Sequence, residues 1–106
     1  MRVLFDHGTP VPIRNLLDPH QIETAYERGR SQLSNGDLLA AAQLEGFDVF
    51  VATDKNISSQ QNLDGLPYAI VVLGSTSWPR IQRSSDTVKL AIDAATPGII
   101  SVIEIP

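Results

Sequence analysis

The chain has 106 residues, 42% of them hydrophobic, carries a formal net charge of -4 and contains no cysteine. We expect one domain, residues 1–106, that buries roughly two-thirds of the surface of its unfolded chain. The composition excludes disulfides and thiolate metal sites, and the negative charge argues against a surface that coats nucleic acid generally. With no signal region and no apolar run near the ~20 residues of a membrane span, we expect an unprocessed cytoplasmic protein without a membrane partner.

The N-terminal part of the chain indicates a strand, a helix and a second strand. The apolar run over residues 2–5 is typical of a short buried strand, and residues 10–17 predict a helix with prolines in its opening turn. Residues 22–26 place β-branched and aromatic side chains at alternate positions, which favours a strand. A polar loop is expected to follow up to Gly36.

The middle of the chain predicts a capped helix that leads into a third strand. Ser34, Asn35 and Asp37 supply capping groups, and the helix is expected over residues 38–45. Its apolar side chains lie on one face. The apolar run over residues 49–52 then predicts a buried strand.

The C-terminal half begins with a surface loop, expected over residues 56–67 because almost no apolar residue occurs there. Residues 68–73 predict a fourth strand. A long helix is expected from Ser77 to Ala95, and residues 99–105 predict a final strand. This alternation indicates a three-layer α/β fold, with a mostly parallel sheet of about five strands and helices on both faces.

Three aspartates are predicted at the carboxyl edge of this sheet, where α/β folds build their sites. Asp6 and Asp54 end apolar strands, and Asp37 opens the helix before the third strand. Converging carboxylates suit Mg²⁺ or Mn²⁺, which prefer oxygen ligands, and a bound ion can assist phosphodiester hydrolysis. An aspartate at a helix start is also a common cap, and for Asp37 that interpretation explains the position equally well.

Cationic residues are predicted near the same edge, although the protein is acidic. Arg28, Arg30 and Lys55 lie in loops that leave this edge, and Arg80 and Arg83 lie in the first turns of the last helix. This arrangement could draw a polyphosphate backbone over the carboxylates. Arg28, Arg30 and Lys55 are therefore predicted substrate contacts.

Three sequence blocks resemble the signature blocks of the PIN domain, most closely its shortened, PIN-like branch. They are residues 3–10 (VLFDHGTP), 35–39 (NGDLL) and 51–56 (VATDKN). The resemblance implies a Mg²⁺- or Mn²⁺-dependent endoribonuclease, in many relatives the toxin of a toxin-antitoxin pair. It implies Asp6, Asp37 and Asp54 as catalytic metal ligands, with Asn56 as an auxiliary ligand. The implied partners are single-stranded RNA, a cognate antitoxin protein and a second copy in a homodimer.

The chain departs from the family pattern in ways that lower the charge of the site. The stretch that carries a further acid in full PIN domains is shortened, and His7 and Asn56 stand where shortened relatives often have acids. We therefore expect weak metal affinity. One alternative is a catalytically degenerate PIN-like module that binds RNA or a protein partner without cleavage. A phospho-accepting receiver domain is disfavoured, because the chain lacks an acidic pair after the first strand and a lysine after the fifth.

Overall fold

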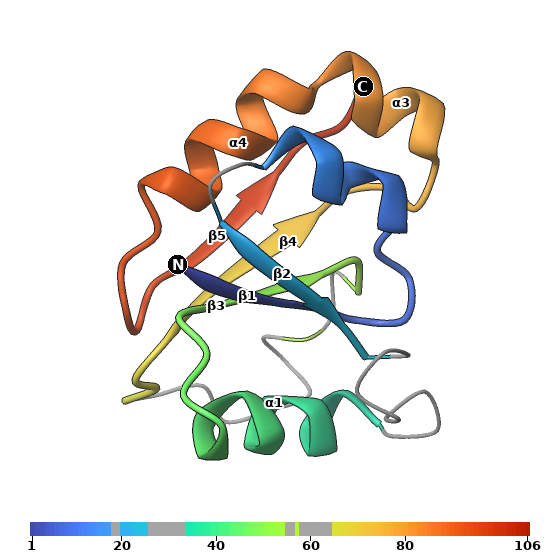
Figure 1. Ribbon diagram of the computed structural model, residues 1–106. Helices are drawn as coiled ribbons and strands as arrows, with labels where there is room; N and C mark the ends of the chain where they lie inside the picture. Colours follow the sequence, from blue (N-terminus) through green and yellow to red (C-terminus); the bar gives the residue numbers. More distant parts are fainter. Residues whose placement is uncertain (18–19, 26–33, 55–56, 58–64) are drawn as a thin grey trace.

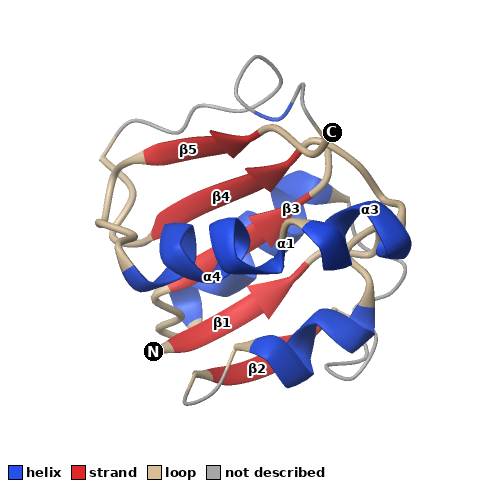
Figure 2. Ribbon diagram, turned by 90° about the horizontal axis from the view of Figure 1, so that it is seen from above, coloured by secondary structure: helices blue, strands red, loops and turns tan. Residues whose placement is uncertain are grey.

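The computed structural model describes the chain except residues 18–19, 26–33, 55–56 and 58–64 and the side chain of residue 35. The strands of the described part are β1 (Arg2–Phe5), β2 (Gln21–Thr24), β3 (Val49–Ala52), β4 (Ala69–Leu73) and β5 (Ile100–Ile103). They form one sheet in the order β2-β1-β3-β4-β5, and every pairing is parallel (Figure 2). The predicted parallel sheet of about five strands is confirmed.

Helices lie on both sides of this sheet. The described part contains η1 (Val11–Leu16), α1 (Asn35–Leu44), α3 (Trp78–Arg83) and α4 (Ser85–Asp93). Figure 1 shows α1 on one side of the sheet and η1, α3 and α4 on the other. α1 begins on the side of the molecule where β1 ends, so its first turn lies toward the carboxyl edge.

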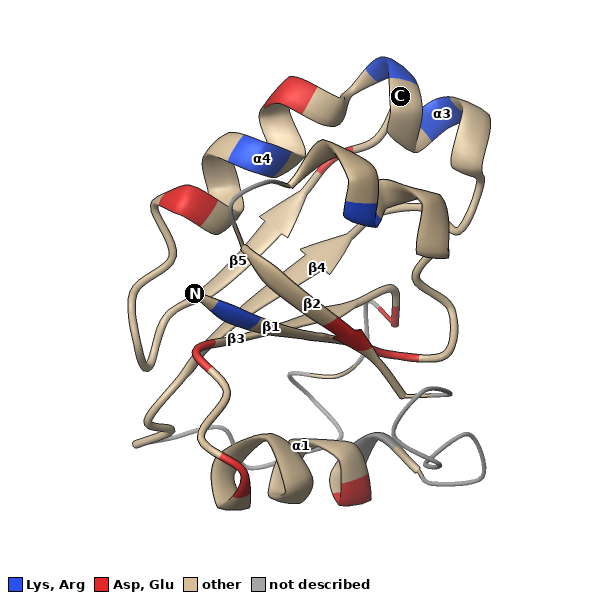
Figure 3. Cartoon of the chain, viewed as in Figure 1, with Lys and Arg blue, Asp and Glu red and all other residues tan. Residues whose placement is uncertain are grey.

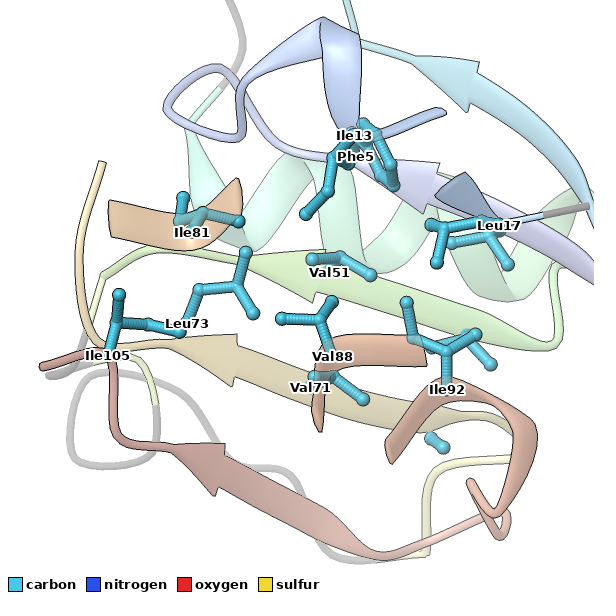
Figure 4. Packing of buried hydrophobic residues seen from close by; sticks show 13 residues of the cluster. Phe5, Ile13, Leu17, Val51, Val71, Leu73, Ile81, Val88, Ile92 and Ile105 are labelled. Atoms are coloured by element: carbon cyan, nitrogen blue, oxygen red, sulfur yellow. The ribbon is translucent and has the colours of Figure 1, made fainter. Parts of the chain in front are cut away.

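The two core clusters explain this layering, because successive side chains of a strand point to opposite faces. Figure 4 shows the larger cluster, in which η1, α3 and α4 pack on one face of the sheet. Its buried members are Val3, Phe5, Ile13, Leu17, Val49, Val51, Ala69, Val71, Leu73, Ile81, Val88, Ile92 and Ile105. The second cluster joins α1 to alternate strand positions on the other face, namely Leu4, Phe50, Ala52, Ile70 and Val72.

Two expected helices differ from the structure. η1 is a 3₁₀ helix of six residues, a form that is common in short connecting segments. The long helix expected up to Ala95 is interrupted at Ser84, which separates α3 from α4. The apolar spacing could not reveal this break, since Ile81 and Val88 both pack into the same core cluster.

The capping of α1 agrees with the sequence pattern. The Ser34 hydroxyl accepts a hydrogen bond from the backbone N–H of Asp37 (3.3 Å), so Ser34 is the N-cap residue. After the helix, Gly46 adopts a φ of 74°, the left-handed conformation that glycine tolerates best. Of the expected loop over residues 56–67, only Ile57 and residues 65–67 lie in the described part.

Candidate functional site

The strand order reverses direction between β1 and β3, and this switch point lies at the carboxyl edge of the sheet. The chain passes from β1 to β2 on one side and then returns to place β3 on the other. Asp6, directly after β1, donates its backbone N–H to the carbonyl of Val51 in β3 (2.9 Å). Ligands of open α/β sheets bind at such switch points. Asp6 therefore occupies the position from which a functional site is expected.

The Asp6 carboxylate is buried, with 6% of the residue exposed, and both of its oxygens accept hydrogen bonds. Oδ1 accepts from the N–H of Gly8 (3.1 Å), the N–H of Thr9 (2.9 Å) and the hydroxyl of Thr9 (2.6 Å). Oδ2 accepts from the N–H of Thr53 (3.0 Å) and more weakly from its hydroxyl (3.4 Å). Asp6 thus joins the loop after β1 to the loop after β3.

Three loops meet above Asp6, and Gly8 lies at their junction. A Cβ on Gly8 would lie 2.2 Å from Oγ1 of Thr53 and 3.5 Å from a methyl carbon of Thr76. Thr76 belongs to the loop that follows β4. A side chain at this position would therefore displace the Thr53 side chain of the loop after β3.

The other two aspartates occupy different environments. Asp54 is half-buried directly after Thr53, and its carbonyl accepts a hydrogen bond from the N–H of Ile57 (3.2 Å). Asp37 is exposed in the first turn of α1, where the Ser34 hydroxyl donates to its Oδ2 (3.0 Å). A negative charge at a helix N-terminus is favourable in itself. The structure thus supports capping as one role of Asp37.

The predicted cationic contacts fall into two groups. Arg28, Arg30 and Lys55, together with the auxiliary ligand Asn56, lie outside the described residues. Arg80 and Arg83 are exposed on α3, whose cationic positions are blue in Figure 3. The substrate contacts expected from the sequence therefore stay predictions.

A magnesium site can be tested against the donors that are present. Among the described residues, no three His, Asp or Glu side chains form a group that could hold a metal ion. The structure therefore does not bring Asp6, Asp37 and Asp54 together as one ligand set, and their shared coordination stays a prediction. Mg²⁺ commonly takes only one or two carboxylates and completes its shell with water and substrate oxygens. Both oxygens of the Asp6 carboxylate already accept hydrogen bonds from the protein, so the described contacts do not by themselves fit a bound cation.

A hollow of about 410 Å³ lies beside the ends of β4 and β5, lined by Gly74 and residues 102–106. It shares the carboxyl edge with Asp6 but is formed by the other end of the strand order. The acidic side chain in its lining is that of Glu104. This hollow does not contain the residues predicted to carry the chemistry.

Sequence reasoning missed Thr9 and Thr53, whose side chains contact the Asp6 carboxylate within the described part of the chain. Thr9 is only 4% exposed, so its buried hydroxyl requires a partner. A usable signal was present, because hydroxyl residues follow both strands within a few positions of an aspartate. Side chains of this type commonly hydrogen-bond within turns.

Comparisons with protein-family models, with curated protein sequences and with solved structures found nothing that matches this chain. No helix in the described part of the chain has the length and apolar character needed to cross a bilayer.

Proposed function

We propose that the chain is a PIN-like, metal-dependent ribonuclease that hydrolyses phosphodiester bonds of single-stranded RNA. The observation that supports this most directly is the link between Asp6 and Thr53 at the β1/β3 switch point, which sets Asp6 beside the segment that carries Asp54. Two carboxylates from adjacent strands at a switch point are a sensible arrangement for binding a divalent ion. Proteins with the same strand order can catalyse different reactions, so the proposal is based on the residues of the site.

Each residue has an assigned role in this proposal. Asp6 and Asp54 would hold Mg²⁺ or Mn²⁺, with Asp37 and Asn56 as the further ligands that the family resemblance implies. When bound, such an ion orients a water and neutralises charge on the phosphoryl oxygens. The cations Arg28, Arg30 and Lys55 would contact the RNA phosphates, which position the strand without reading its sequence.

Resemblance to the PIN-like branch also suggests the biological setting. We propose a cytoplasmic toxin of a toxin-antitoxin pair, with a cognate antitoxin protein as partner and a homodimer as the assembly. The low charge of a site with His7 and Asn56 in place of acids would make its metal affinity weak. Millimolar metal is therefore the expected working range for cleavage.

A second candidate function has its own supporting observation. Five donor contacts surround the Asp6 carboxylate, and a carboxylate offers about four lone-pair positions. Asp6 could then serve only to hold two loops together. In that case the chain would be a degenerate PIN-like module that binds RNA or a protein partner without cleaving it.

Cleavage assays with matched variants separate the two functions. We expect the purified chain to cleave single-stranded RNA with millimolar Mg²⁺ or Mn²⁺, to stop when chelator is added, and to lose about 100-fold or more in rate in Asp54→Asn. Asp86→Asn is the control, because Asp86 is an exposed aspartate on α4. RNA binding should survive Asp54→Asn, whereas Arg28→Ala with Arg30→Ala should weaken binding and flatten its salt dependence.

The opposite result is equally specific. If the chain binds RNA or a protein but leaves every tested RNA intact with both metals, the ribonuclease proposal fails. If the double variant His7→Glu, Asn56→Asp then gains cleavage, the degenerate-module function is supported, because only the charge of the site was changed.

A further inference from the structure

The outer side of α4 carries charged residues and one large apolar residue close together. The inner side of the helix buries Val88 and Ile92 in the core. The opposite side includes four exposed residues, which we call the α4 stripe, namely Asp86, Lys89, Leu90 and Asp93. The same four line a hollow of about 410 Å³. Leu90 is 68% exposed, but a single exposed leucine is common, so the charges around it matter more.

The charges of the α4 stripe alternate along the helix. Asp86, Lys89 and Asp93 are negative, positive and negative in turn, which Figure 3 shows as red, blue and red bands on α4. Asp93 forms an ion pair with His20. Within the described part of the chain, neither Asp86 nor Lys89 has an ion-pair partner. One negative and one positive side chain, less than a helical turn apart, are therefore open to a partner.

A two-fold axis matches this pattern with itself. In a symmetric pair of copies the same patch lies on both sides, so a contact from residue i to residue j is accompanied by one from j to i. If two α4 helices lie antiparallel about an axis level with residues 87–88, Asp86 of each copy faces Lys89 of the other. Two ion pairs then flank the axis, and Leu90, next to Lys89, comes under the facing helix.

We infer that the α4 stripe is the surface through which a second copy of this chain binds. This inference rests on the homodimer of the proposed function, to which it adds the contact surface. α4 has nine residues and is roughly 14 Å long, so the contact is at the small end of specific interfaces and the dimer is weak. Because salt screens exposed ion pairs, the affinity falls as the ionic strength rises.

Charge reversal tests this pairing, because a mixture of two variants can restore what each variant loses alone. Sedimentation equilibrium at low salt should give a wild-type dimer with a Kd of about 10 μM to 1 mM. Lys89→Asp and Asp86→Lys should each bind themselves about tenfold or more weakly, since like charges then face each other. Their equimolar mixture should associate as the wild type does, because each variant presents the charge that the other needs.

The apolar contact is tested with a matched control. Leu90→Gln should weaken the dimer about fivefold or more, whereas Val102→Gln, at a position 61% exposed on β5, should leave it unchanged. Thermal midpoints show that each variant is folded.

Three results would overturn the inference: a wild type that stays monomeric at about 1 mM, a mixture no more associated than its components, or equal effects of Leu90→Gln and Val102→Gln. A dimer that no α4 variant weakens would also overturn it, while the homodimer itself would stand. RNA cleavage is assayed at far lower chain concentrations, where the chain is monomeric. The ribonuclease proposal and this inference can therefore fail independently.

Discussion

The Tyr68 hydroxyl donates a hydrogen bond to the backbone carbonyl of Leu39, 2.8 Å away within α1. Tyr68 precedes β4 and is only 1% exposed, so this bond fastens α1 to the sheet from inside the second core cluster. A buried hydroxyl with a partner stabilises the fold, and the same hydroxyl cannot ionise without losing that bond. This leads to a prediction for alkaline conditions.

Burial raises the pKa of Tyr68 from 10.0 to about 12. Because the folded state holds this proton more tightly than the unfolded state, the contribution to stability is complete below pH 10 and is lost as the pH rises toward 12. The free energy of unfolding should fall by about 2 to 3 kcal/mol over this range, since one pKa unit corresponds to about 1.4 kcal/mol. Urea unfolding across this range would measure it. In Tyr68→Phe the free energy of unfolding should depend less steeply on pH, and an unchanged dependence would show that Tyr68 is not the titrating group.

Asp6→Asn should destabilise the metal-free protein by about 1.5 to 3 kcal/mol, the usual value for hydrogen bonds to a charged group. An amide presents one oxygen and one N–H₂ group, so either Thr9 or the N–H of Thr53 then faces a donor. The comparison is Asp54→Asn, which is half-buried and should change stability by less than about 1 kcal/mol. Free energies from urea unfolding decide this prediction, and equal losses in the two variants would refute it.

Gly8→Ala should destabilise the fold by about 1 to 3 kcal/mol, the range for inserting a methyl group into a packed site. The new Cβ would lie 2.2 Å from Oγ1 of Thr53. The double variant Gly8→Ala, Thr53→Ala should recover much of the loss, because the clashing oxygen is then absent. A double-mutant cycle measures this coupling, and simple additivity of the two losses would show that the contact is not the cause.

Ser34→Ala should cost about 1 kcal/mol of stability, because the N-cap hydroxyl is lost from α1.

Asp37→Asn should cost about 0.3 to 1 kcal/mol, since it removes a negative charge from the first helical turn. Both losses are expected without metal and can be measured by thermal unfolding. If Mn²⁺ stabilises the wild type and Asp37→Asn alike, Asp37 acts as a cap and not as a ligand.

The sheet could be predicted from the sequence because its strands are buried runs with sharp ends. β1 and β3 have the bounds that the apolar pattern gives, and β4 and β5 lie within their predicted ranges. The break at Ser84 could not be predicted, because the positions that pack on the sheet continue across it. The 3₁₀ form of η1 could not be predicted either, because prolines in an opening turn are equally compatible with an α-helix.

The candidate site was predictable in position but not in detail. The ends of β1 and β3 meet because parallel strands share one carboxyl edge, so Asp6 and Asp54 could be expected there from order alone. The division of donors between Oδ1 and Oδ2 depends on loop conformations that no periodicity encodes. Asp37 shows the same limit, since one position in the first turn of a helix serves equally for a cap or a ligand.

The place of β1 inside the sheet has a consequence for synthesis on the ribosome. β1 pairs with β2 on one edge and with β3 on the other, and β3 begins 25 residues after β2 ends at Thr24. At about 5 to 20 residues per second, the backbone N–H and C=O groups on the second edge of β1 stay without their partner strand for about 1 to 5 seconds. An open strand edge is a template for pairing with another chain. The yield of folded protein should therefore fall when many copies are synthesised close together, even where the completed protein does not aggregate at the same concentration.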